Sequence, residues 1–160
     1  MPKEIERKFL LDVLPNHIST YQCFHIEQGY ISVALDGTEV RVRRKDTQCF
    51  LTVKKGNGGV REETEIEISA SQFVALWPLT EGRRIEKNRY SFAAGIEVDV
   101  YQGTLAPLIV AEIEFDSLEG SKTYKVPPWF GKEVTDDNAY KNRTLALYGL
   151  PNGRGRVCER

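Results

Sequence analysis

Charged and apolar residues alternate along much of this chain. In the first stretch, residues 4–11, the charged residues Glu4, Glu6 and Lys8 occupy every second position, and the apolar residues fall mainly between them. Successive side chains of a β-strand point to opposite faces, so this spacing predicts a strand with one charged face. The same alternation, bounded by turn residues, predicts further strands at residues 28–33, 38–44, 50–54, 60–68, 83–92, 95–101 and 107–115.

Two segments have helical spacing instead. Ser69 is a helix-cap residue, and the apolar residues from Phe73 to Trp77 follow it at helical spacing until a proline ends the run. Residues 138–147 carry apolar positions among polar ones and predict a C-terminal helix. Each helix has one apolar side, so each is expected to cover an apolar surface.

Length and composition favour one domain. A chain of 160 residues with 41% hydrophobic and 28% charged content has enough apolar surface for one sizeable core and too little for two. We expect a single domain over residues 1–150. The Gly- and Arg-containing segment after Pro151 predicts a disordered tail over residues 151–160.

The overall charge excludes several classes of partner. With 22 basic and 23 acidic residues the formal charge is −1, so no bulk basic field is present to recruit nucleic acid or an anionic membrane. The chain has no apolar run as long as a membrane span and no signal-peptide pattern. Its three cysteines, Cys23, Cys49 and Cys158, lack a Cys-x-x-Cys pair and fit a reducing compartment. We expect a cytoplasmic protein; a homodimer is left open.

The charged faces can be placed in two ways. They can all meet water around an apolar interior, as in an ordinary sandwich or barrel. Alternatively, the sheet closes with the charged faces inside, and the helices near residues 73–77 and 138–147 pack on an apolar exterior. Solvated faces usually mix polar residues at random, whereas these charges come in short pairs such as Glu-x-Glu and Arg-x-Arg. The pairing favours the enclosed arrangement.

Enclosing these faces would bring both signs of charge into one space. The basic residues are Lys8, Arg41, Arg43, Lys54, Arg61, Lys87 and Arg89, and the acidic residues are Glu4, Glu6, Glu63, Glu65, Glu112 and Glu114. Isolated buried charges cost several kcal/mol each, so such a space stays hydrated, pairs its charges or receives ligands of both signs. A polyphosphate with a divalent metal is such a ligand.

Glu4-x-Glu6-x-Lys8, together with the order of the later pairs, resembles the CYTH superfamily, also called triphosphate tunnel metalloenzymes, over about residues 3 to 150. Gly29-Tyr30, the Thr135 to Asn142 segment and the Pro-Pro-Trp-Phe-Gly loop at 127–131 resemble the short bacterial inorganic tripolyphosphatases. The resemblance implies an α+β fold: an eight-stranded antiparallel β-barrel, or tunnel, with a charged lumen and helices packed outside.

The resemblance also implies roles. Metal ligands would be Glu4, Glu6, Glu112 and Glu114, with Glu63 and Glu65 as further ligands or lumen partners, and the metal would be Mg²⁺ or Mn²⁺. The seven basic residues would hold the phosphates of a small triphosphate. We expect the 127–131 loop and Tyr140 to serve packing, and His17 and His25 not to bind metal.

The leading hypothesis is hydrolysis of inorganic tripolyphosphate to pyrophosphate and phosphate. Water would be activated by a metal or by Lys8, in contact with Tyr30. A lysine base would have to lose its proton, and nearby carboxylates oppose that loss, so metal activation is favoured. Two alternatives remain: an organic triphosphate enzyme, resembling thiamine triphosphatase or class IV adenylyl cyclase, and a non-catalytic polyphosphate-binding module.

Overall fold

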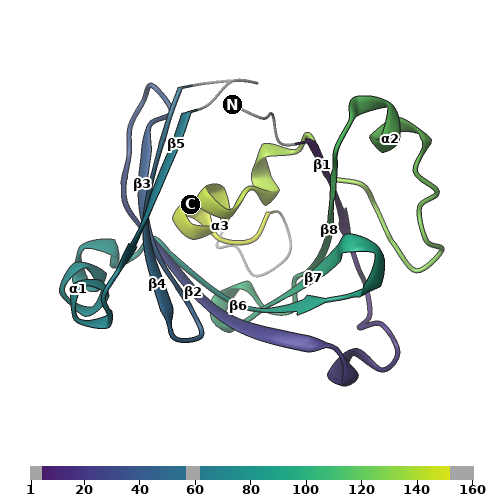
Figure 1. The fold of residues 1–160 in the computed structure, drawn as a ribbon, viewed down its shortest axis with the longest axis horizontal. Coiled ribbons are helices and arrows are strands. Elements are labelled where there is room, and N and C mark those ends of the chain that lie inside the picture. The colour runs from purple at the N-terminus through teal and green to yellow at the C-terminus, as the bar shows by residue number, and fades with distance from the viewer. Residues whose placement is uncertain (1–4, 57–61, 152–160) are drawn as a thin grey trace.

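In the computed structural model, which describes residues 5–56 and 62–151, eight antiparallel strands form one sheet. Its order is β1-β8-β7-β6-β2-β3-β4-β5, and Figure 1 shows it curving around helix α3. No ladder within the described ranges joins the end strands β1 and β5. The strands are β1 (Ile5–Leu10), β2 (Gln22–Val33), β3 (Glu39–Lys45), β4 (Gln48–Lys55), β5 (Glu62–Ile68), β6 (Arg84–Ser91), β7 (Ile96–Tyr101) and β8 (Ile109–Phe115). The expected eight-stranded antiparallel architecture is confirmed.

The strand register places the charged positions on one face. Residues directly opposite on neighbouring strands share a face, and Lys8 lies opposite Glu112, Arg89 opposite Asp99, and Lys54 opposite Glu63. Tyr30, Arg41, Thr52 and Glu65 form one such row across four strands. Tyr30 packs with Leu145 of helix α3, and Figure 1 shows this helix on the concave side of the sheet, so we call this face the inner face.

Helix α1 (Ala70–Leu76) packs on the opposite, outer face. Ser69 accepts a hydrogen bond from the backbone of Gln72, and the Gln72 side chain accepts one from the Ser69 backbone, which completes a capping box. Phe73 is 1% exposed and packs with Val42 and Cys49. The prediction of a capped helix covering an apolar surface is confirmed.

Helix α3 (Asn142–Tyr148) corrects one expectation. Together with the 3-10 turn η5 (Asn138–Tyr140), it replaces the helix predicted at 138–147, and it lies within the curve of the sheet, not outside it (Figure 1). Leu145 packs against inner-face residues that include Leu10, Tyr30 and Tyr101. An amphipathic pattern shows that a helix has an apolar side but not which face of the sheet it covers.

One end of the inner face is apolar, and this explains the position of α3. Leu10, Tyr30, Ile85, Tyr101 and Val110 come from five strands and form a core cluster there. Leu145, Ala146 and Leu150 complete the cluster. The remainder of the inner face carries the charges, so α3 closes the apolar end of a charged concavity.

The 127–131 loop packs against the first strand. Phe130 contacts Phe9 with ring centroids 4.9 Å apart and ring planes tilted by 46°, and Gly131 approaches Leu10 so closely that a Cβ would lie 2.6 Å from its carbonyl oxygen. These contacts fit the packing role expected of the 127–131 loop. The short helix α2 (Leu118–Thr123) was not predicted. Three further 3-10 turns are η1 (Ile18–Thr20), η3 (Ala93–Gly95) and η4 (Gly103–Leu105), and η2 (Trp77–Thr80) continues α1.

Several expectations concern residues outside the described ranges: Glu4, Arg61, Cys158 and the tail from residue 152. Within the part of the chain that the structure describes, no helix has the length and apolar character needed to cross a membrane.

Candidate functional site

Strands β1, β8 and β7 carry four glutamates on the inner face. Glu6 lies opposite Glu114, and Glu112 lies opposite Glu97. We call these four residues the acidic wall. Like charges opposite each other in a sheet are destabilising unless cations lie nearby. The Nζ of Lys8 is 3.8 Å from Glu112, and a terminal nitrogen of Arg89 is 3.5 Å from Glu97.

Next to the acidic wall, Asp99 of β7 is surrounded by two cations from β6. Its carboxylate accepts hydrogen bonds from Lys87 Nζ at 2.8 Å and from Arg89 Nε at 2.8 Å. The side chains of Lys87 and Asp99 are 0% and 2% exposed. We call these three residues the Asp99 cluster.

Burial and pairing act against each other in the Asp99 cluster. Burial alone would raise the pKa of Asp99, but Lys87 and Arg89 hold this pKa well below its ordinary value. Asp99 is shared between two cations and only partly offsets the effect of burial on Lys87. Burial lowers the pKa of Lys87 to about 8, although the nearby Asp99 carboxylate acts to raise it. Burial also disfavours the charge of Arg89, yet Asp99, Glu97 and Glu112 raise the pKa of Arg89. Asp99 is therefore ionised and offsets charge that the fold has enclosed.

Helix α3 adds a neutral contact to this cluster. The Asn142 side-chain oxygen accepts hydrogen bonds from Tyr101 Oη at 2.6 Å and from Lys87 Nζ at 3.5 Å. Burial raises the pKa of Tyr101 well above its ordinary value, so its hydroxyl stays protonated and donates. Arg143, also on α3, lies 3.3 Å from Glu39, which is 3% exposed at the start of β3. These contacts tie α3 to three strands.

Strand β3 presents two arginines with no carboxylate partner in the described residues. Arg41 is 8% exposed, and its Nε is buried without a hydrogen-bond partner there. Arg43 Nε donates to the neutral side-chain oxygen of Gln28 at 2.7 Å. Burial, and then Arg41 and Arg89, lower the pKa of Arg43 to about 10. We call Arg41 and Arg43 the arginine pair. A buried guanidinium without a partner is costly, so this site favours an anion.

The far side of the inner face is occupied by β4 and β5. Lys54 Nζ lies 3.3 Å from Glu63, and Glu65 accepts a hydrogen bond from the Thr52 hydroxyl at 2.7 Å. The two expected further ligands thus lie on β5, four strands from β6 in the sheet order, and both already have partners.

The proposed catalytic residues lie on the inner face, but not together. Lys8 Nζ donates to the Tyr140 carbonyl at 3.4 Å, while Tyr30 Oη accepts a hydrogen bond from Gln28 at 2.8 Å. The expected contact between Lys8 and Tyr30 is absent from the described residues. The reason is topological: β1 and β2 are separated by three strands. Burial raises the pKa of Tyr30, so this phenol stays protonated.

The polar inner-face residues that were not among the predicted site residues include Gln28, Glu39, Glu97 and Asp99. Asp99 and Glu97 alternate with apolar residues in the predicted strand at 95–101, a signal that could have added them to the set. Glu39 could have been added in the same way, because it lies two positions before Arg41 and four before Arg43 and so shares their face of the predicted strand. Gln28 carries no charge, and nothing in the local pattern marks it.

Comparison with known proteins agrees with this fold. The family model for the CYTH domain matches residues 2–136. The chain belongs to the CYTH family. The match includes all eight strands but ends before α3.

Two relatives and one solved structure are similar to this CYTH chain over most of its length. The inorganic triphosphatase of Nitrosomonas europaea is 45% identical over 90% of this chain and 97% of its own length. The inorganic triphosphatase of Acetivibrio thermocellus is 37% identical over 91% and 94% of the two chains. The crystal structure of an inorganic triphosphatase superposes with a TM-score of 0.75 at 43% identity, covering 92% of this chain and 96% of that one.

The acidic wall supplies the oxygen donors that hard divalent cations prefer. The CYTH resemblance implied a metal, and the two opposed glutamate pairs fit one, because a cation between them would offset their repulsion. Within residues 5–56 and 62–151, no three carboxylate, histidine or cysteine side chains form a ready ligand group. Glu4, the remaining expected ligand, lies outside the described residues.

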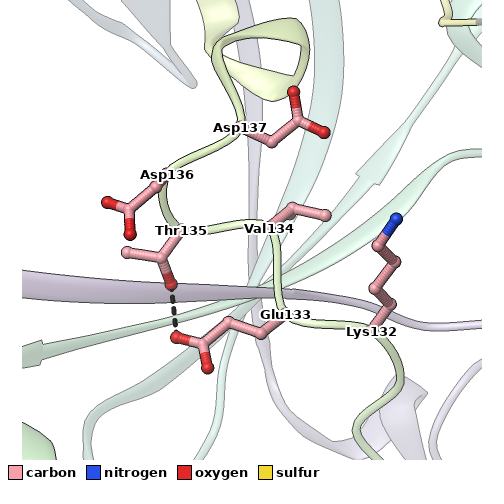
Figure 2. Close-up of a pocket in the computed structure, with 6 residues that line it drawn as sticks. All are labelled: Lys132, Glu133, Val134, Thr135, Asp136 and Asp137. Carbon is pink, nitrogen blue, oxygen red and sulfur yellow. Dashed lines mark hydrogen bonds between the residues drawn. The ribbon is translucent and has the colours of Figure 1, made fainter.

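A hollow beside residues 132–137 has a structural explanation. These residues line a space of about 470 Å³, and Figure 2 shows them with the hydrogen bond between Thr135 and Glu133. Glu133 also accepts hydrogen bonds from two nitrogens of Arg7, and Asp137 caps η5 through the Ala139 backbone. Glu133 thus ties the loop to β1 and Asp137 stabilises the following turn, so the inner face remains the candidate site.

Proposed function

We propose that this CYTH protein is a metal-dependent phosphoanhydride hydrolase that converts inorganic tripolyphosphate to pyrophosphate and phosphate. The observation that carries the proposal is that the arginine pair and the acidic wall lie on one concave face. The first provides cationic donors for phosphate oxygens, and the second provides oxygen ligands for a metal. The inorganic triphosphatases at 45% and 37% identity support the same activity.

The metal would be Mg²⁺ or Mn²⁺, held by Glu6, Glu112 and Glu114 together with Glu4, which lies two positions before Glu6 in the sequence. When bound, it would supply positive charge to the phosphates and lower the pKa of a bound water. Glu63 and Glu65 stay proposed as further ligands or partners across the concavity. Their contacts with Lys54 and Thr52 favour the second role.

The chain's own cations would bind and orient the triphosphate. Arg41 and Arg43 are suited to bidentate contacts with phosphate oxygens, and Lys8, Lys54, Arg61 and Arg89 would add charge around them. Lys87 is fully buried against Asp99, so its proposed contribution is to hold Arg89 and Asp99 in place. Phosphoryl transfer depends mainly on such positioning and charge stabilisation.

The chemical step needs no nucleophilic side chain. Water attacks a terminal phosphorus, the bridging P–O bond breaks, and pyrophosphate leaves. Lys8 Nζ lies 3.8 Å from Glu112 and donates a hydrogen bond to the Tyr140 carbonyl, so we assign it to phosphate binding and not to proton removal. Tyr30, protonated and buried, would donate a hydrogen bond rather than act as a base.

A substrate and metal panel tests this proposal. Phosphate release from tripolyphosphate, thiamine triphosphate and ATP is measured with Mg²⁺, Mn²⁺ or Ca²⁺, together with cyclic AMP formation from ATP. We expect tripolyphosphate to be the best substrate, with activity lost on chelation. Faster turnover of ATP or thiamine triphosphate would contradict the inorganic substrate, and tight binding without turnover would indicate a binding module.

Two carboxylate variants separate the metal site from general charge effects. Glu112→Gln should raise the metal concentration for half-maximal activity by roughly tenfold or more, since one anionic ligand is lost. Glu62→Gln removes the same charge from an exposed position on the outer face of β5 and should leave the metal requirement unchanged. Equal effects of the two variants would contradict the assigned metal site.

A further inference from the structure

Two arginines on the same pair of strands are held by different partners. On the outer face, Arg44 of β3 donates through Nε to the carboxylate of Glu27 at 2.9 Å. On the inner face, the preceding residue Arg43 donates through Nε to the amide oxygen of Gln28 at 2.7 Å. In each case the two residues are direct cross-strand partners. The two contacts match in backbone position and donor atom but differ in the charge of the acceptor.

The orientation of the Gln28 amide is fixed by its neighbours. Gln28 is 0% exposed, so water does not satisfy it. Arginine has only donors, so the amide oxygen must face Arg43. The amide nitrogen then donates to Tyr30 Oη at 2.8 Å. Because the phenol oxygen accepts this bond, the hydroxyl proton of Tyr30 is left to be donated elsewhere.

This arrangement leaves the Arg43 charge uncompensated. The inner-face cations Lys8, Lys54, Lys87 and Arg89, and Arg143 of α3, each have a carboxylate within 4 Å. Lys45 instead lies over the Phe24 ring, 4.2 Å from its centroid. Among the described residues, the terminal nitrogens of Arg43 make no hydrogen bond, and the adjacent Arg41 has a buried Nε without a partner. A glutamate at position 28 would fit the same space and satisfy Arg43 with a stronger, charge-assisted bond.

We propose that Gln28 is a positioning residue: it fixes the Arg43 guanidinium for a phosphate group of the substrate without cancelling its charge, and it directs the Tyr30 hydroxyl proton toward the same space. This inference rests on the proposed function, since it takes a phosphate-bearing substrate as the ligand of Arg43. It explains why the partner of the inner-face arginine is a fully buried amide, whereas the partner of the outer-face arginine is a partly exposed carboxylate.

The test compares three variants with the wild type: Gln28→Glu, Gln28→Met and the matched outer-face change Glu27→Gln. For each, kcat and KM with tripolyphosphate, binding of tripolyphosphate in the presence of a chelator, and urea unfolding are measured. Gln28→Glu should raise KM and weaken metal-free binding at least about tenfold, the effect of losing one charge-assisted bond, without loss of stability. Gln28→Met should lower kcat/KM and also lower stability.

The matched variant Glu27→Gln should leave both kinetic constants and binding unchanged. The inference is overturned if Gln28→Glu binds tripolyphosphate as the wild type does, or if Glu27→Gln weakens binding equally. Failure of the proposed function looks different: the wild type itself would not turn over tripolyphosphate. If it binds without turnover, the metal-free binding comparison still decides the role of Gln28.

Discussion

The Asp99 cluster and the arginine pair lie on the same inner face but differ in whether a carboxylate compensates their buried positive charge. In the cluster, one carboxylate accepts hydrogen bonds from two cations, and all three side chains are largely enclosed. In the pair, Arg41 and Arg43 are held without any carboxylate contact in the described residues. Compensated charge holds the sheet together, whereas uncompensated charge remains available to an anion. The Asp99 cluster should therefore determine the stability of the fold, and the arginine pair should determine the binding of an anionic ligand.

The largest expected effect is on stability, from Asp99→Ala. Removing this carboxylate leaves Lys87 and Arg89 without their main buried partner, which should reduce the free energy of unfolding by about 3–5 kcal/mol. Chemical denaturation measures the change. Glu133→Gln breaks the ion pair with Arg7 at a more exposed site and should cost about 1 kcal/mol or less. Similar losses in both variants would remove the distinction between the two regions.

The second effect is on activity, from Arg41→Gln. Loss of a guanidinium that has no partner for its buried Nε should lower kcat/KM for tripolyphosphate by about 10²–10³, as loss of one transition-state donor does. The unfolding free energy should stay equal or rise, because a costly buried charge is gone. Parallel losses of activity and stability would instead make Arg41 a structural residue like Asp99.

The pH dependence of stability should show a smaller effect of Lys87. Its pKa is about 8 in the folded chain and 10.5 as the ordinary value, so between these values the unfolded chain binds more protons. Stability should therefore rise with pH from about 8 toward 9.5 relative to Lys87→Met, which has no proton to lose. Urea unfolding across this range measures the difference, and parallel curves for the two proteins would refute the shift.

The smallest effect is expected outside both regions. Ser69→Ala removes one half of the α1 capping box and should cost about 1 kcal/mol of stability. Because α1 packs on the outer face, kcat and KM should not change. A kinetic effect would show that the outer face is coupled to the site.

Much of the fold was predictable because the charged and apolar positions of most strands alternate in the sequence itself. The period of two identified the strands and the face that carries Arg41, Arg43 and the glutamates. The strand β2 spans Gln22–Val33 and so extends before residues 28–33, where its pattern is clearest, because residues 22–29 pair with β6. Local pattern does not contain this long-range pairing.

The less predictable features depend on register and packing between distant segments. Asp99 becomes the partner of Lys87 and Arg89 only through the β6–β7 register. Gln28 gains its importance from Arg43 and Tyr30 on either side, not from its own chemistry. Lys8 and Tyr30 were placed in contact without knowledge of the strand order, which separates them.

The position of α3 also bears on where this domain can be cut. The match to the CYTH family model ends at residue 136, yet the core cluster that contains Tyr30, Ile85 and Tyr101 is completed by Leu145, Ala146 and Leu150. A fragment that ends at residue 136 would keep all eight strands but lose helix α3, which covers the apolar end of the inner face. The interior of the fold is thus completed by a segment that lies beyond the matched family region.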